Sequence, residues 1–235
     1  MRFHGSQAFL TYISPIYITV ICIALAPGAL PAQAQTPPSS SSNSAKHIKK
    51  PSASNSDLDP GAAANNVYLN KTLGLTCKIP EGWVLRTDEM NAREDEKDSA
   101  GSGPSSSSTG ARVLLAAFSR PPEARAEDVN SSILIAAEPA TSYPGLKDAA
   151  QYFGPLGEVA KAQGFTEDEE PYEIAVGTKT LVRADFHKDV GSRIMHQSTL
   201  ALLSHGYAVS ITLIAGTEDD VEELIDGITF SAAGK

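Results

Sequence analysis

The sequence predicts an α+β fold in which an antiparallel β-sheet is sandwiched by helices, with a disordered N-terminal tail before it. Three observations support this fold class. Most apolar segments are short or alternate with polar residues, as strands do. Two pairs of these segments flank short glycine-containing turns, which are typical of hairpins and therefore of antiparallel pairing. Two segments repeat their apolar residues at helical spacing. Since the hairpins demand antiparallel pairing, a doubly wound parallel sheet is disfavoured.

The first 34 residues have the three parts of a Sec-type signal peptide. A basic Arg2 precedes an apolar stretch over residues 13–30, which ends at the small-residue site Ala32-Gln33-Ala34. We expect cleavage after Ala34, which gives a secreted or periplasmic protein with no stable membrane span. The alternative is an uncleaved anchor, for which the stretch is about long enough. Three residues disfavour a spanning helix: Pro15, Pro27 and Gly28.

The remainder of the chain is expected to form a tether and one domain. Residues 35–65 are rich in Ser, Pro, Asn and Lys, a composition that buries too little apolar surface to offset the entropy of ordering. We interpret them as a disordered linker, followed by a single α+β domain over residues 66–231. Near residues 88–111 a charged and then Ser/Gly-rich stretch separates two apolar segments. It is interpreted as a flexible insertion without the chemistry of a site.

Composition and charge limit the partners. The chain of 235 residues is 41% hydrophobic, enough for a packed core, and carries a formal net charge of −9. Nucleic acid is therefore not expected as a partner, since phosphate binding needs a basic face. Of the two cysteines, Cys22 leaves with the signal peptide, and Cys77 lies in phase with the apolar residues around it. We expect Cys77 to be a buried thiol without a disulfide partner.

Strands are expected in the first half of the domain. Residues 73–79 alternate apolar and polar side chains and stop at Pro80-Glu81-Gly82, a sequence typical of a turn. An extended run restarts at Trp83. Residues 113–118 and 133–137 are short apolar runs, which we expect to be central strands covered on both faces.

Two helices are expected. Over residues 146–163 apolar residues recur at helical spacing. Gly154-Pro155 should kink or break this helix because proline lacks the amide donor, and Gly164 should cap its end. The second helix follows Thr217, whose hydroxyl and following acids match a variant of the capping box and favour the positive helix start.

Two hairpins are expected between these helices. Residues 172–176 and 179–187 flank Gly177-Thr178, a glycine-first connection suited to a type II′ turn. Residues 193–203 and 207–214 flank a second, three-residue connection. Both hairpins require antiparallel strands.

The extended segment 73–79 followed by Pro80-Glu81-Gly82-Trp83, together with the closing strand, acidic helix and Ile228-Thr229-Phe230, resembles a known pattern. It is similar to the beginning and end of PsbP-like domains, a group that includes the photosystem protein PsbP and exported bacterial proteins of the DcrB and LpqN kind. The resemblance implies an antiparallel sheet between helices across residues 66–231. The group shares no catalytic residues, so the resemblance implies no site. The chain departs from the lipoprotein members because it lacks an attachment cysteine.

Five residues are candidates for a binding site. Arg183, Asp185 and His187 share one strand face through the period of two, and the next strand is able to bring His196 alongside. An aspartate with two histidines is able to hold a metal or to act in acid–base chemistry. The favoured alternative is a half-exposed polar sheet face with cross-strand ion pairs, so neither a metal site nor a catalytic residue is assigned. Trp83 is the fifth candidate if it is exposed; otherwise it is an aromatic anchor.

No sequence motif of a common catalytic or nucleotide site is present in the chain. The sequence therefore predicts an exported, non-enzymatic accessory or binding module of the cell envelope, with no cofactor. Its partner is an unknown protein or small molecule in the envelope. The alternative is an exported hydrolase or metal-dependent enzyme of unrecognised type.

Overall fold

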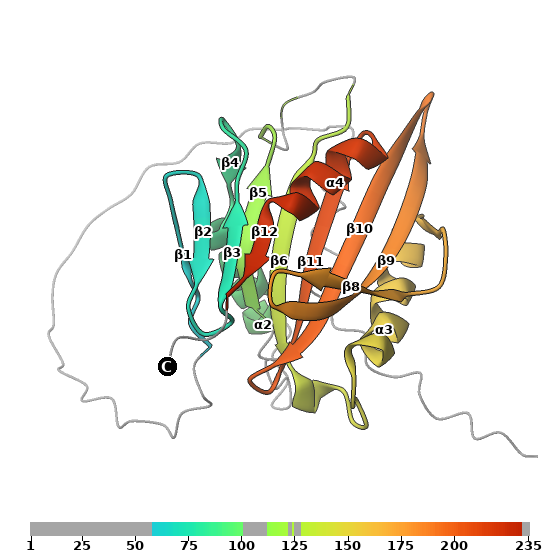
Figure 1. The fold of residues 1–235 in the computed structure, drawn as a ribbon. Coiled ribbons are helices and arrows are strands. Elements are labelled where there is room, and N and C mark those ends of the chain that lie inside the picture. The colour runs from blue at the N-terminus through green and yellow to red at the C-terminus, as the bar shows by residue number, and fades with distance from the viewer. Residues whose placement is uncertain (1–57, 101–111, 122–123, 125–127, 232–235) are drawn as a thin grey trace, which may run out of the picture.

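The computed structural model describes residues 58–100, 112–121, 124 and 128–231 (Figure 1). The predicted signal peptide, residues 35–57 of the predicted linker and residues 101–111 of the predicted insertion lie outside the described residues. Within these ranges the chain forms an eight-stranded sheet and a four-stranded sheet. Neighbouring strands pair in antiparallel fashion in both sheets, which confirms the α+β fold class.

The large sheet contains the longest strands of the described chain. Its strands are β4 (Val84–Leu85), β5 (Arg112–Phe118), β6 (Ser132–Pro139), β7 (Thr166–Glu167), β8 (Tyr172–Val176), β9 (Lys179–Val190), β10 (Arg193–Ser204) and β11 (Tyr207–Ala215). They lie in the order β4-β5-β6-β11-β10-β9-β7, and β8 also pairs with β9. The apolar runs over residues 113–118 and 133–137 are β5 and β6, and both are buried along most of their length, as expected for central strands.

The small sheet brings together the beginning and the end of the described chain (Figure 1). It consists of β1 (Ala62–Ala64), β2 (Val67–Asn70), β3 (Leu75–Lys78) and β12 (Ile228–Phe230), in the order β1-β2-β3-β12. The strand expected over residues 73–79 is β3. It starts two residues later than expected because the amide of Gly74 donates to the carbonyl of Lys71 in a turn.

Residues 58–65 are ordered against this sheet, although the sequence predicted a linker up to residue 65. Leu58 is buried. The Tyr68 hydroxyl donates to the Pro60 carbonyl at 2.9 Å, and Asn70 Nδ2 donates to the Asp59 carbonyl at 2.6 Å. These contacts come from β2, so the local composition of the segment did not reveal them.

Helices cover both faces of the large sheet. They are α2 (Thr87–Ala100), α3 (Ala149–Ala162) and α4 (Glu218–Asp226), and a short 3-10 helix, η2, spans Ala140–Ser142. On one face α2 packs through Met90 against β5 and β6, and α3 packs through Phe153 and its neighbours against β9 and β10. On the other face α4 and the small sheet share the main hydrophobic cluster with the large sheet. The large sheet therefore lies between a layer formed by α2 and α3 and a layer formed by α4 and the small sheet (Figure 1).

Helix α2 occupies much of the stretch near residues 88–111 for which the sequence predicted a flexible insertion. The Asn91 side chain donates to the Val113 carbonyl at 2.9 Å and accepts from the Val113 amide at 3.1 Å. The Thr87 hydroxyl accepts from the Ala116 amide at 2.9 Å. These bonds pair the backbone of β5 beyond its short partner β4. The helix is strongly polar and Met90 is its buried apolar residue, so helical periodicity did not reveal it.

Helix α3 is not broken at Gly154-Pro155, where the sequence predicted a kink or a break. Proline removes the hydrogen bond that the Gln151 carbonyl would accept, but Gln151 is exposed and water is available to it. The helix begins at Ala149, later than expected, because the Asp148 carboxylate accepts from the Gln151 amide at 2.9 Å and fixes the start there.

Both expected hairpins are present, as β8–β9 and β10–β11. At the first turn Gly177 has φ +60° and Thr178 has a negative φ, which fits the expected type II′ turn. At the second turn His205 (φ +54°) and Gly206 (φ +81°) are both left-handed, which is typical of type I′ and shortens the connection to two residues. Helix α4 is capped as expected, because the Thr217 hydroxyl accepts from the Asp220 amide at 3.1 Å.

Candidate binding surface

Four of the five candidate residues lie together on the face of the large sheet that α4 covers. Arg183, Asp185 and His187 alternate along β9, so their side chains point to the same face. On β10, Ser198 lies opposite Asp185, and His196 lies opposite His187. The period of two therefore predicted that the three β9 residues share one face. The register of β9 and β10 adds that His196 lies opposite His187, which the sequence left open.

Trp83 is remote from this group. It directly precedes β4, which lies near one end of the strand order, whereas β9 lies near the other end with β5, β6, β11 and β10 between them. Its side chain is half-buried and packs against the main hydrophobic cluster. Its amide faces the Pro80 carbonyl across the turn at 3.4 Å. Trp83 therefore has the environment of an aromatic anchor, and it does not share a site with the β9 residues.

Asp185 organises the polar group. Its carboxylate accepts from the Tyr172 hydroxyl at 2.8 Å, from Arg183 Nε at 2.9 Å and from the Ser198 hydroxyl. Ser198 is buried and Asp185 is half-buried. Three donors from β8, β9 and β10 thus meet one carboxylate, which fixes the relative positions of these strands.

Arg183 links the sheet to α4. Its guanidinium donates to Glu222 Oε1 at 2.5 Å and lies over the Tyr172 ring, 5.9 Å from the ring centroid. The side chain is 13% exposed. Burial opposes its charge, but the hydrogen bonds to Glu222 and Asp185 outweigh that effect and raise the pKa of Arg183. Arg183 therefore stays charged and pairs with two carboxylates.

Tyr172 stays protonated in this environment. Burial raises its pKa to about 12, and the hydrogen bond to Asp185 acts in the same direction because it favours the neutral hydroxyl. A neutral phenol donates a hydrogen bond to Asp185 and is not a nucleophile at neutral pH.

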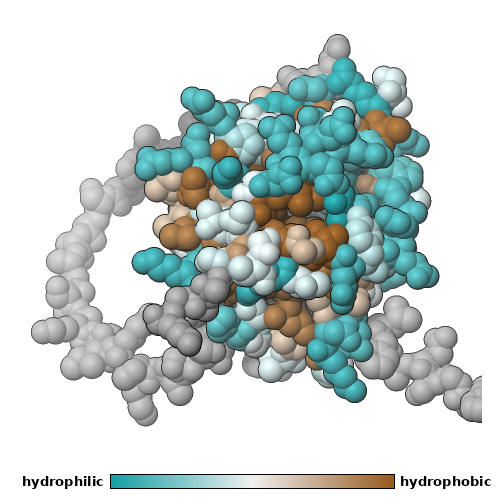
Figure 2. Space-filling view, viewed as in Figure 1, coloured by the Kyte–Doolittle hydropathy of each residue, from teal (hydrophilic) through white to brown (hydrophobic). Residues whose placement is uncertain are grey.

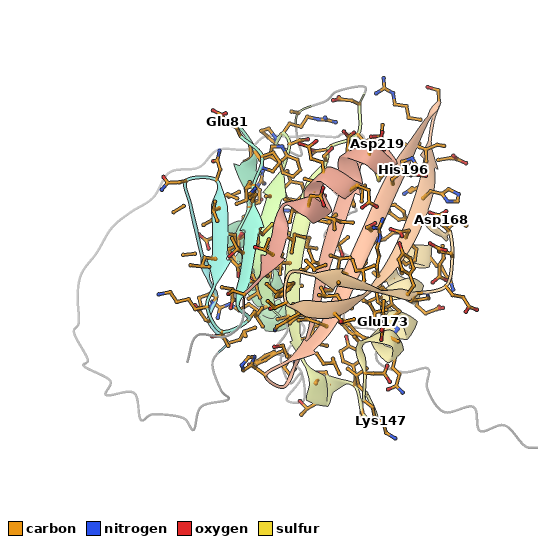
Figure 3. All side chains as sticks on the ribbon, viewed as in Figure 1. Glu81, Lys147, Asp168, Glu173, His196 and Asp219 are labelled. Carbon is orange, nitrogen blue, oxygen red and sulfur yellow. The ribbon has the colours of Figure 1, made fainter. Side chains whose placement is uncertain are left out.

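The two histidines each face a carboxylate. His187 Nδ1 donates to Asp168, and His196 Nδ1 lies 3.7 Å from Glu218 Oε1. Asp168 follows β7, and Glu218 begins α4. Figure 3 shows Asp168, His196 and Asp219 at the same end of the sheet, far from Glu81 beside Trp83. The histidine pair is therefore flanked by acids from two further elements.

An exposed apolar residue lies beside the histidines. Ile194 is 45% exposed and precedes His196 by two residues, so the two share a strand face. We call the group of Ile194, His187, His196, Asp168 and Glu218 the acid–histidine surface. In Figure 2 the part of the surface that α4 forms is mostly hydrophilic.

The described residues contain no group of three or more His, Cys, Asp or Glu side chains placed to hold a metal ion. The histidines are held in separate pairs with carboxylates, and the Asp185 carboxylate is occupied by three donors. The arrangement consists of charge pairs and hydrogen bonds within the protein.

Three residues of the polar group were not among the sequence candidates. Ser198 was within reach of the same pattern, since it follows His196 by two residues. Tyr172 and Glu222 were not, because β8 and α4 meet β9 only in three dimensions. The acids at the start of α4 were interpreted as helix capping, and the structure adds that Glu222 binds Arg183.

None of the helices formed by the described residues is both long enough and apolar enough to span a membrane. A scan against models of protein families finds no family that matches the chain. A search of the curated proteins likewise finds no match.

Solved structures do match. Cyanobacterial PsbP from Synechocystis sp. PCC 6803 is 15% identical over 73% of this chain and 98% of its own, with a TM-score of 0.42. LpqN of Mycobacterium tuberculosis, described as involved in cell envelope biogenesis, is 16% identical over 67% and 83%, with a TM-score of 0.35. A Pseudomonas aeruginosa protein of unknown function is 17% identical over 43% and 68%, with a TM-score of 0.31.

PsbP and LpqN are proteins of the kind that the sequence pattern resembles. The likeness concerns the fold. At these identities and TM-scores it carries no functional residue and no activity to this chain.

Proposed function

We propose that this chain is an exported, non-enzymatic accessory module of the cell envelope that docks a basic protein partner on its acid–histidine surface. The observation that carries the proposal is Ile194, an exposed apolar side chain beside two histidine–carboxylate pairs. Interfaces commonly combine an apolar anchor with a polar rim, and the anchor supplies most of the binding energy.

The strands below this surface are rigidly joined. Asp185 ties β8, β9 and β10 together, and Arg183 ties them to α4. A surface held in this way loses little conformational entropy when a partner binds.

The charges favour a basic partner. The formal net charge of the chain is −9, and acids from the β7–β8 connection and from α4 flank the histidines. Complementary charge speeds association and excludes acidic partners. Export rests on the signal-like residues 1–34, which place such a partner outside the cytoplasm.

The proposal is tested by quantitative capture of partners from an envelope extract, with the full chain as bait. We expect one protein with a basic surface to be retained at about equal stoichiometry, and retention to fall as salt is raised. Ile194→Glu should reduce its retention at least tenfold. Leu69→Glu, at a comparably exposed residue of β2, should not.

Equal retention by wild type and Ile194→Glu would contradict the docking surface. A hydrolase panel tests the enzymatic alternative. Turnover that is lost in His187→Ala, with the fold intact, would replace the accessory role with catalysis.

A further inference from the structure

The two histidines of the acid–histidine surface lie directly opposite one another. His187 of β9 and His196 of β10 are partners in the strand register. Side chains at opposite positions of an antiparallel pair have Cβ atoms about 4.5–5.5 Å apart. Ile194 lies two residues before His196, so it belongs to the same face. The imidazoles therefore form a cross-strand pair beside the apolar residue on which the proposed docking rests.

Both rings are accessible to solvent. The side chain of His187 is 37% exposed and that of His196 is 19% exposed. Histidine is the side chain whose charge ordinarily changes between about pH 5 and 8, whereas aspartate and glutamate ordinarily stay ionised above about pH 5. His205, the remaining histidine of the described residues, lies in the turn between β10 and β11, at the other end of β10. Within the described chain, a change of histidine charge is therefore concentrated at the acid–histidine surface.

The charged groups around this pair are mainly acids. Arg183 is a cation on the same face of β9, and it is already paired with Asp185 and Glu222. On β10 and β11 the neighbouring Ser198 and Ala215 carry no charge. With neutral histidines the surface is therefore acidic, which favours a basic partner. The titratable and charged groups around the pair are Arg183, Asp185 and Asp189 on β9, the neutral Tyr172 on β8, Asp168 and Glu169 in the β7–β8 connection, and Glu218, Asp219 and Glu222 on α4.

Protonation of the histidines reduces this acidity. His187 Nδ1 contacts Asp168, and His196 Nδ1 lies 3.7 Å from Glu218 Oε1. A positive charge on either ring neutralises the carboxylate beside it, which then attracts a cation of the partner less strongly. Two positive charges at opposite positions repel one another, and the two carboxylates offset that repulsion. Charging both rings therefore makes the surface less negative by two charges without breaking either histidine–carboxylate pair.

We propose that pH regulates docking at the acid–histidine surface: the basic partner binds while His187 and His196 are neutral and dissociates more readily when both are protonated. The inference rests on the proposed function, since it requires a basic partner at Ile194. Residues two apart on a strand are separated by about 7 Å, and charges act over about 8 Å at physiological salt. A partner that covers Ile194 is therefore within range of the histidine charges. The side chain of Ile194 does not titrate, so pH changes the electrostatic attraction and leaves the apolar contact in place.

The probe is a capped pentapeptide of alternating lysine and leucine, which supplies cations for the acids and apolar side chains for Ile194. It is titrated into the full chain at low salt, and binding is followed by NMR at the methyl groups of Ile194. We expect the dissociation constant to be about fivefold higher at about pH 5.5 than at about pH 8. In the double variant His187→Gln/His196→Gln, which keeps polar side chains but cannot gain these charges, the ratio of the two constants should be close to one. His205→Gln should keep the wild-type ratio.

A wild-type dissociation constant that is equal at both pH values would overturn the regulation. If that binding is still lost in Ile194→Glu, the docking surface stands and the pH dependence alone is wrong. Absence of a peptide-dependent shift of the Ile194 methyl groups at the higher pH would contradict the proposed docking and this inference together. An unchanged ratio in the double variant, whose fold is checked by its NMR spectrum at both pH values, would assign the pH dependence to other groups and would also overturn the proposal.

Discussion

Gly177 lies directly against the backbone of Phe230. A Cβ atom at Gly177 would be 2.6 Å from the Phe230 carbonyl oxygen and 2.7 Å from its nitrogen. That carbonyl accepts from both the amide and the hydroxyl of Thr178, at 3.1 Å and 3.0 Å. The ammonium of Lys179 also lies 5.2 Å from the centre of the Phe230 ring. The β8–β9 turn is therefore fastened to β12, and this contact joins the two sheets.

Gly177→Ala should destabilise the fold strongly because the new methyl group meets the backbone of β12 and because φ is +60°. Gly206→Ala is the matched control, since its φ is +81° but a Cβ there meets no atom within 4 Å. We expect a loss of about 1 kcal/mol for the control and about 3 kcal/mol or more for Gly177→Ala, measured by denaturant unfolding. Equal losses would mean that the contact with Phe230 is not tight.

Asp185→Ala should be costly, since it removes the shared acceptor of Tyr172, Arg183 and Ser198. We expect a loss of about 2–4 kcal/mol in the free energy of unfolding, because the buried Ser198 hydroxyl and the half-buried Tyr172 and Arg183 lose this acceptor. Asp168→Ala is the comparison, because the Asp168 side chain is 41% exposed and should cost less than about 1 kcal/mol. If both variants unfold alike, Asp185 does not organise the polar group.

The thiol of Cys77 should be unreactive in the folded protein. Cys77 is fully buried in the main cluster, as the sequence predicted, and burial raises its pKa to about 12. Alkylation by iodoacetamide should then require unfolding and follow the denaturant transition. Rapid modification in buffer, well below that transition, would show that β3 opens locally.

Stability should decrease in alkaline solution. The pKa of Cys77 is raised from 9.0 to about 12 by burial, so the unfolded thiol ionises first as the pH rises. The contribution of the neutral thiol is therefore fully present below about pH 9 and is lost as the pH approaches 12. In Cys77→Ala the decline between these values should be shallower, by at most about 1.4 kcal/mol per pH unit. An unchanged slope would mean that the thiol ionises equally in both states.

Local patterns predicted the parts of the fold that local forces determine. The apolar runs of β5 and β6, the turn at Gly177 and the cap at Thr217 all depend on residues close together in the sequence. β1 and α2 were missed for the opposite reason. β1 pairs with β2, and the residues before it are held by hydrogen bonds from Tyr68 to Pro60 and from Asn70 to Asp59. Helix α2 is held by hydrogen bonds between Asn91 and β5.

The same limit applies to the candidate site: the pattern within one strand was predicted, and the contacts between elements were not. The period of two placed Arg183, Asp185 and His187 on one face, because that spacing is a property of a single strand. The alignment with His196 depends on hairpin register, and the pairing of Arg183 with Glu222 depends on how α4 packs. Arg120 Nε and Gln197 Oε1 are buried without a hydrogen-bond partner. Whether such an atom is paired depends on neighbours from distant parts of the chain, so the sequence does not reveal it.

The acid–histidine surface is tested most directly by photo-crosslinking in living cells. A photoreactive residue is placed at position 194 in one strain and at position 69, the exposed Leu69 of β2, in another. We expect a discrete protein adduct in the envelope from position 194 and none from position 69. No adduct at 194, or the same adduct from both positions, would contradict docking at this surface.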